Sequence, residues 1–136
     1  MSEFDLDELY NLLEFKECPV EAAFHVLGRK WAVSILREML RGVSQFNRLE
    51  ENIIGINPRI LSMRLKDLQR FGIVQRRVIS AAESPVRVEY QITELGHELE
   101  PILVAAAKFS MIRMPRRVFK DGKPRFPEEL WAELED

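Results

Sequence analysis

The chain has 136 residues, with 20 lysines and arginines against 22 aspartates and glutamates, and a formal charge of −2. This length fits one domain that can bury a core without metals or disulfides, and the single cysteine excludes an internal disulfide. No apolar run approaches the roughly 20 residues that span a bilayer. The acidic start lacks the basic and apolar regions of a signal peptide, so we expect a cytoplasmic protein that does not associate with membranes.

The charge is unevenly distributed along the chain. Residues 1–17 hold six acids and one base, whereas residues 54–93 hold seven bases and three acids. The near-neutral total argues against a nucleic-acid partner. A local excess of base supports such a partner if the bases share one surface, so the positions of these bases decide the question.

Apolar spacing predicts a series of helices in the first half of the chain. They cover 5–15, 19–27, 30–41, 45–52 and 58–71. Pro19 and Pro58 suit the first position of a helix, and Ser44 and Asn57 suit N-caps.

The helix predicted at 58–71 has two different faces. Leu61, Leu65 and Leu68 form an apolar stripe at helical spacing. Three bases on the opposite side fall within about 40° of one another. The basic and polar face consists of Arg59, Ser62, Met63, Lys66 and Arg70. The bases of this segment therefore share a surface.

After Gly72 the apolar period changes from helical to alternating, which predicts a β-hairpin over 73–79 and 86–92 with a polar loop between. Thr93 suits the N-cap of a long helix from residue 94 to about 114, with Pro101 inside it as a kink. Asp121-Gly122 indicates a turn, and residues 127–134 predict one or two helical turns.

This order of elements predicts a mainly α (α+β) fold, a winged helix-turn-helix with additional terminal helices for dimerisation. A major groove admits one α-helix, so helix 58–71 is the predicted recognition helix and loop 80–87 the wing. Arg59 and Ser62 are expected nearest the base edges, because N-terminal residues of such a helix usually are. Arg70 is expected to meet phosphate or solvent. The predicted DNA-binding residues are Lys30, Ser44, Gln45, Arg48, Asn57, Arg59, Ser62, Met63, Lys66, Arg77 and Arg87.

Several motifs also resemble one family. They are CPVEAAFHVLGRKW (18–31), ILREMLRG (35–42), FNRLEENIIGINPRILSMRLKDLQRFGIVQRRV (46–78) and VRVEYQITELGHEL (86–99). Over roughly residues 15–112 the chain resembles the HxlR family of winged helix-turn-helix transcription regulators. The resemblance implies a homodimer on an inverted-repeat operator, acting as repressor or activator, and in some members a cysteine like Cys18 that senses oxidants or electrophiles.

Two positions depart from that family pattern. Arg29 stands where the family usually has a second glycine, which either adds a charge near DNA or alters the turn. Glu83 reduces the positive charge of the wing, so Arg87 is the better candidate for a minor-groove contact.

Four segments are expected. They are an acidic arm (1–17), the DNA-binding domain (18–93), a dimerisation helix (94–115) and an extension of unknown role (116–136). The last helix and residues 5–27 offer apolar surface for a two-fold dimer, with packing inside one chain as the alternative.

Cys18 precedes Pro19 at a predicted helix start, where the helix dipole favours a thiolate. An inert, partly buried cysteine is the alternative. His25 and His97 are not accompanied by the other cysteine, histidine or carboxylate ligands that a metal site needs. We expect no metal and no cofactor. The alternatives to a DNA-binding regulator are a winged-helix protein-interaction module without sequence-specific DNA binding and a thiol-dependent enzyme at Cys18. Winged-helix interaction modules often lack a cationic recognition face, whereas this chain has one. A thiol-dependent enzyme would need a base or a resolving cysteine, and the sequence offers neither. We therefore expect a protein that is not an enzyme.

Overall fold

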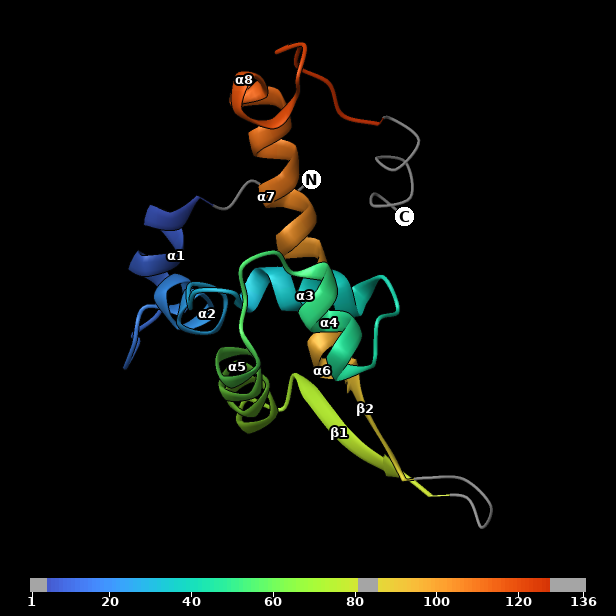
Figure 1. Ribbon diagram of the computed structural model, residues 1–136. Coiled ribbons are helices and arrows are strands. Elements are labelled where there is room, and N and C mark those ends of the chain that lie inside the picture. The colour runs from blue at the N-terminus through green and yellow to red at the C-terminus, as the bar shows by residue number, and fades with distance from the viewer. Residues whose placement is uncertain (1–4, 81–85, 128–136) are drawn as a thin grey trace.

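The computed structural model describes residues 5–80 and 86–127 (Figure 1). In chain order its elements are α1 (Leu6–Leu12), α2 (Pro19–Leu27), α3 (Ala32–Leu40), α4 (Phe46–Asn52), α5 (Pro58–Arg70), β1 (Val74–Ile79), β2 (Arg87–Ile92), α6 (Glu94–His97), α7 (Glu100–Arg113) and α8 (Pro115–Val118). The two strands are antiparallel, with Val74 opposite Ile92 and Ile79 opposite Arg87. The predicted mainly helical fold with a β-hairpin is confirmed.

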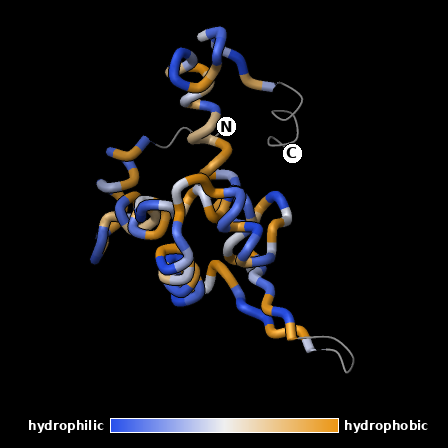
Figure 2. The backbone as a smooth tube through the Cα atoms, viewed as in Figure 1, coloured by the Kyte–Doolittle hydropathy of each residue, from blue (hydrophilic) through white to orange (hydrophobic). Residues whose placement is uncertain are grey.

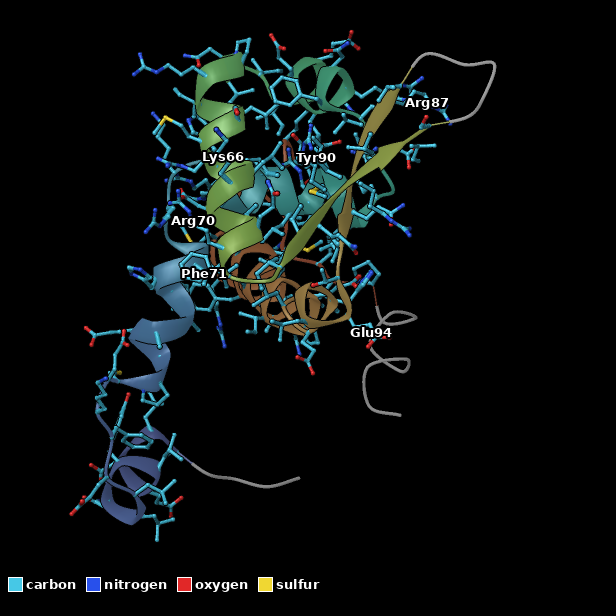
Figure 3. All side chains as sticks on the ribbon, turned by 90° about the horizontal axis from the view of Figure 1, so that it is seen from below. Lys66, Arg70, Phe71, Arg87, Tyr90 and Glu94 are labelled. Carbon is cyan, nitrogen blue, oxygen red and sulfur yellow. The ribbon has the colours of Figure 1, made fainter. Side chains whose placement is uncertain are left out.

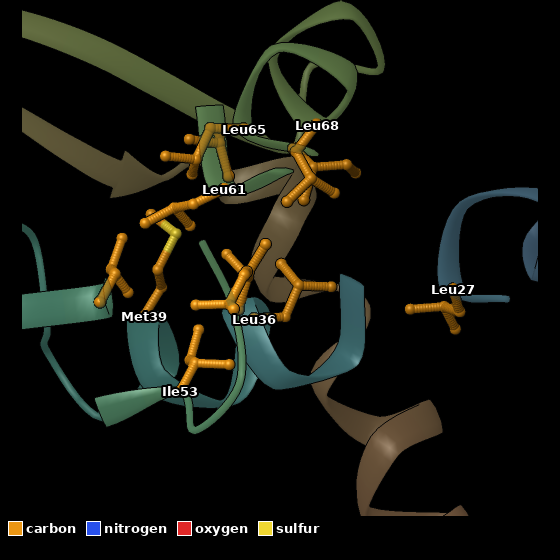
Figure 4. Packing of buried hydrophobic residues seen from close by; sticks show 12 residues of the cluster. Leu27, Leu36, Met39, Ile53, Leu61, Leu65 and Leu68 are labelled. Carbon is orange, nitrogen blue, oxygen red and sulfur yellow. The ribbon is translucent and has the colours of Figure 1, made fainter. Parts of the chain in front are cut away.

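The core lies where α3, α4 and α5 meet the base of the hairpin. Its largest fully buried side chains are Ile35, Leu36, Leu49, Leu61 and Leu65. Figure 4 shows the leucines of α5 directed at α3 and its neighbours. The apolar stripe predicted for 58–71 is therefore confirmed as the buried face of α5, and it sets how this helix is oriented.

The ends of α5 are fixed by local hydrogen bonds. Asn57 Oδ1 accepts from the Ile60 amide at 2.9 Å, and Pro58 occupies the first turn, as predicted. At the other end Gly72 has a φ of +77°, and the Ile73 amide donates to the Leu68 carbonyl at 2.9 Å. This glycine-terminated cap turns the chain sharply from α5 into β1.

A buried carboxylate joins α3 to α4. Glu38 is only 3% exposed, and it accepts from Asn52 Nδ2 at 3.2 Å and from Arg41 Nη1 at 3.4 Å. A buried charge is tolerated when it is paired and hydrogen-bonded. Glu38 therefore fixes the spacing of the two helices that precede α5.

The hairpin is attached to the helices through β2. The Tyr90 amide donates to the Ser44 carbonyl at 2.8 Å, and the Tyr90 and Phe46 rings lie 6.4 Å apart. This contact corrects the prediction for Ser44, because the N-cap position of α4 is Gln45. The backbone of Ser44 instead pairs with β2.

Two predicted helix boundaries were wrong. Trp31 has a left-handed backbone with φ +76°, so the helix predicted from Lys30 begins at Ala32. The single helix predicted over 94–115 is divided into α6 and α7, and Pro101 lies in the first turn of α7. Because proline removes a backbone donor and clashes with the preceding turn, the first helix ends at His97 and a new helix begins at Glu100, with the proline in its first turn.

Of the remaining predictions, some are confirmed, one is wrong and some concern residues outside the described ranges. Thr93 caps α6 by accepting from the Gly96 amide at 3.0 Å. The turn predicted at Asp121-Gly122 is present, and the Gly122 amide donates to the Phe119 carbonyl at 3.1 Å. The alternation of apolar residues over 86–92 predicts a half-buried strand, but Val86 at its outer end is exposed, as is Val78 on the strand beside it. The predicted wing tip, 81–85, and most of the helical turns predicted at 127–134 lie outside the described residues. No helix in the described ranges is long and apolar enough to cross a membrane.

Candidate nucleic-acid interface

The exposed face of α5 is cationic. Arg59, Lys66 and Met63 are exposed, and Ser62 is partly buried. Neither Arg59 nor Lys66 forms an ion pair with any residue that the structure describes. Figure 3 shows Lys66 and Arg70 along α5, beside the hairpin that carries Arg87 at its outer end. Two bases of α5 are therefore available to an anionic partner.

One carboxylate on α5 gathers three arginines. Asp67 is 17% exposed, and its oxygens lie 3.1 Å from Arg29 Nη1, 3.4 Å from Arg64 Nη1 and 3.6 Å from Arg70 Nη1. Arg70 is 79% exposed, so its contact with Asp67 is screened by solvent. The contact to Arg64 lies within α5, whereas the contact to Arg29 connects α5 to the turn between α2 and α3.

That turn is held against α5 by further contacts. Arg64 Nε donates to the Lys30 carbonyl at 2.8 Å, and the His25 and Phe71 rings meet edge to face at 5.8 Å. The Arg29 guanidinium is paired with Asp67 at 3.1 Å, so this charge is engaged in a contact with α5. Arg29 therefore fastens α2 to α5.

Four of the predicted DNA-binding residues lie between the end of α2 and the end of α4. Gln45 and Arg48 are exposed at the start of α4, and Ser44 is half-buried with its carbonyl bonded to β2. Lys30 is exposed, and its ammonium lies 5.3 Å from the centre of the Trp31 ring.

Alternation of the strands places Arg77 and Arg87 on one face of the hairpin. Arg77 Nη1 donates to Gln91 Oε1 at 3.3 Å, which holds its side chain along the strand. Arg76 lies on the other face, opposite Tyr90, and is exposed. Sequence reasoning did not select Arg76, although its position in the alternating pattern could have indicated it.

Cys18 lies at the N-cap of α2, away from α5. Its Sγ is 2.8 Å from the Tyr10 hydroxyl of α1. This hydrogen bond, together with the nearby backbone amides of Glu21 and Val20, lowers the pKa of Cys18 below its ordinary value, while the same bond raises the pKa of Tyr10. The thiolate form is therefore favoured at this position.

Sequence reasoning missed the residues that hold the surface in place. Asp67, Arg64 and Glu38 read as ordinary charges on amphipathic helices, and their partners lie 14–38 positions away along the chain. Only the three-dimensional structure brings these partners together.

A three-helix core, a helix-turn-helix of α4 and α5 and a β-hairpin wing together define the winged helix-turn-helix class of transcription regulators. The chain belongs to the HxlR-like helix-turn-helix family, whose sequence profile matches residues 26–118. It is thus a transcriptional regulator of the helix-turn-helix type.

Comparison with individual proteins agrees with this assignment. The HTH-type transcriptional regulator YdeP of Bacillus subtilis is 34% identical over 95 residues, covering 70% of this chain and 73% of YdeP. The reduced form of the transcriptional regulator YodB from B. subtilis matches with 34% identity and a TM-score of 0.62, over 69% of this chain and 91% of YodB. The redox regulator HypR in its reduced form matches with 34% identity and a TM-score of 0.63, over 68% and 90%.

Neutralising Asp67 is expected to destabilise the fold. In Asp67→Asn, Arg29 and Arg64 lose their shared carboxylate, and the free energy of unfolding is expected to fall by about 1 kcal/mol. Urea denaturation measures this change. Glu51→Gln removes an exposed carboxylate that has no ion pair among the described residues and is expected to leave stability unchanged. Equal losses in both variants would contradict a special role for Asp67.

Proposed function

We propose that the chain is a homodimeric regulator that binds a specific double-stranded DNA site, an inverted repeat. In this proposal α5 enters the major groove and the hairpin approaches the adjacent minor groove. One observation carries the proposal, namely that α5 is anchored by its leucines and exposes Arg59 and Lys66 without ion pairs in the described chain. We assign base contacts to residues of α5 and contacts with the DNA backbone or minor groove to residues of α4 and the hairpin.

Residues at the start of α5 would read base edges, because this end of a recognition helix enters the groove first. Arg59 and Ser62 are our candidates, with Met63 and Lys66 beside them. The Asn57 side-chain oxygen is used to cap α5, which leaves its amide NH2 group for a phosphate oxygen. Contacts at the phosphates position the protein and do not specify sequence.

The preceding helix and the hairpin would add backbone contacts. The exposed side chains of Gln45 and Arg48 are our candidates at α4, together with the Ser44 hydroxyl and Lys30. Arg77 and Arg87 share one hairpin face, and arginine is favoured in a narrow minor groove.

The dimer would form through α2, α3 and α7. No residue of α7 is buried, although most of its residues are apolar (Figure 2). A helix with this composition is normally covered by a partner. Beside it lies an apolar groove of about 560 Å³, with apolar walls formed by Phe24, Leu27, Val33, Leu40, Ile102 and Leu103.

A second copy of the chain is the occupant that we propose for this groove. Its rim carries Arg37 and Arg41 on α3 and Glu100 on α7. Opposite charges on one patch suit a two-fold interface, in which each residue type meets its complement from the other chain. Such a dimer would present two α5 helices to successive major grooves, roughly 34 Å apart.

Arg59→Ala is expected to weaken binding to the operator by about 1–3 kcal/mol and to relax sequence preference at one base step. Lys66→Ala is expected to weaken binding more evenly across sequences and to reduce the salt dependence by about one counterion. Titration of labelled duplex at several salt concentrations measures both effects. Lys16→Ala, an exposed base of the N-terminal arm, is the matched control.

The result that argues against this assignment is equal binding by Arg59→Ala, Lys66→Ala and Lys16→Ala. Steep salt dependence of duplex binding favours the DNA-binding regulator, because each neutralised phosphate releases counterions. Its absence favours the protein-interaction module.

We further propose that Cys18 makes the regulator responsive to oxidants or electrophiles. The hydrogen bond from Tyr10 and the lowered pKa of Cys18 support this role, because the thiolate is the reactive form. The structural neighbour HypR is described as a redox regulator. With one thiol in each chain, the products open to Cys18 are a disulfide between chains or an adduct with a small molecule.

Tyr10→Phe is expected to raise the pKa of Cys18, because the thiolate loses its largest stabilising hydrogen bond. Since alkylation follows the thiolate fraction, the midpoint of the rate against pH is expected to move to higher pH. The rate of reaction with iodoacetamide across pH measures this shift. Tyr90→Phe removes the other tyrosine hydroxyl and serves as control. An unchanged midpoint in Tyr10→Phe would refute the assigned role of the hydroxyl.

A further inference from the structure

We propose that the acidic N-terminal arm of one chain docks on a basic C-terminal surface of the second chain in the dimer. Of the acidic arm (1–17), the structure describes residues 5–17, and the contact is proposed for these residues. The basic C-terminal surface comprises Arg113, Arg116, Arg117, Lys120 and Lys123. This inference rests on the proposed homodimer and adds a contact to it outside the groove between α2, α3 and α7.

The acidic arm has charges and apolar side chains without partners. Apart from Lys16, the charged side chains of residues 5–17 are five carboxylates, those of Asp5, Asp7, Glu8, Glu14 and Glu17. None of these carboxylates forms an ion pair within the described part of the chain.

 Residues 5–17 of the arm thus hold five acids and one base, six charged side chains in all. Its negative charge is available to a cationic partner.

The same arm exposes apolar side chains. No residue of α1 is buried, and Leu6, Leu12 and Leu13 are all more than half exposed. The capping box between Asp5 and Glu8 keeps α1 helical without help from the core. Its contacts to the start of α2 run through Tyr10, which meets Phe15 and Cys18. An ordered helix with an uncovered apolar side is suited to docking on another surface.

The basic C-terminal surface is built by a folded turn after α8. The Arg125 guanidinium lies 3.8 Å from the centre of the Phe119 ring, and its Nη1 is 2.9 Å from Asp121 Oδ1. Residues 113–127 hold six bases and one acid, and this acid is taken by Arg125. The five bases of the surface form no ion pair within the described ranges. No carboxylate of the described residues therefore offsets the charge of these five bases.

Apolar side chains lie next to these bases. Met114, Val118 and Phe109 are exposed on α7 and α8, with Phe109 61% exposed. The surface thus combines positive charge with apolar area, and the acidic arm combines negative charge with apolar area. The two are complementary in both respects.

The positions of the two segments favour a contact between chains. In Figure 1, α8 lies at the far end of α7, on the opposite side of the molecule from the hairpin tip, and α1 lies apart from α8 beside α2. A duplex seated on α5 would therefore not extend to α8 of the same chain. A two-fold dimer brings a second α1 to the molecule, and the same contact then forms twice.

Reversing charges on one partner at a time tests the contact. The arm variant is Asp7→Lys with Glu14→Lys, which leaves the capping box intact, and the surface variant is Arg117→Glu with Lys120→Glu. Each variant alone is expected to raise the dimer dissociation constant roughly tenfold at low salt, because opposed pairs become like-charged. Sedimentation of the chain without DNA measures the dimer.

Mixing the two variants isolates a contact between chains. In a mixed dimer the reversed arm meets the reversed surface, while the native arm of one chain meets the native surface of the other. The mixture is therefore expected to dimerise as tightly as the native chain. A control mixture replaces the arm variant with Glu50→Lys and Glu51→Lys on α4, which makes the same change in net charge and is expected to give no recovery.

The outcomes separate this contact from the dimer itself. A native chain that stays monomeric at all concentrations overturns both proposals. A native dimer whose dissociation constant is unchanged by either reversal overturns the arm contact alone. Weakened dimers that mixing does not restore, or that the α4 control restores equally, also overturn it, because the effect is then within one chain or due to net charge.

Discussion

The structure depends on α5 being buried on one side and exposed on the other. Leu61, Leu65 and Leu68 pack into the core against α3, and this packing fixes the rotation of the helix about its own axis. Because side chains on a helix follow a fixed 100° spacing, burying the leucines necessarily turns Arg59 and Lys66 outward. Hydrophobic packing and the cationic surface are therefore two results of one sequence pattern.

Polar contacts then hold α5 against the rest of the domain. Asp67 connects it to Arg29 at the end of α2, and Arg64 binds the carbonyl that follows. The same α2 carries Cys18 at its other end, joined to α1 by Tyr10. A single short helix thus links the thiol of the proposed sensor to the proposed recognition helix. In the proposed function, this is the physical route by which a modified Cys18 would affect α5.

The sequence predicted what depends on local pattern. The stripe of α5, its Asn57 cap, the existence of the hairpin and the Thr93 cap follow from spacing and from residue types with local preferences. The errors have physical causes as well. Ser44 is a good N-cap by residue type, but its carbonyl pairs with Tyr90 of β2, a contact 46 positions away. Trp31 adopts a left-handed backbone that side-chain type does not indicate. The cluster around Asp67 depends on such distant contacts and was not predictable.

The net charge of the chain does not show how its charges are arranged in space. The total of −2 conceals a cationic α5, an acidic arm and a basic C-terminal surface, each of which has a separate location in the fold.

The measurement that tests the central claim most directly is selection of bound sequences from random duplex DNA by the native chain. The account predicts an enriched motif with two-fold symmetry and half-sites about 10 base pairs apart, or a multiple of that spacing. Enrichment of no motif, despite a folded protein, would contradict it.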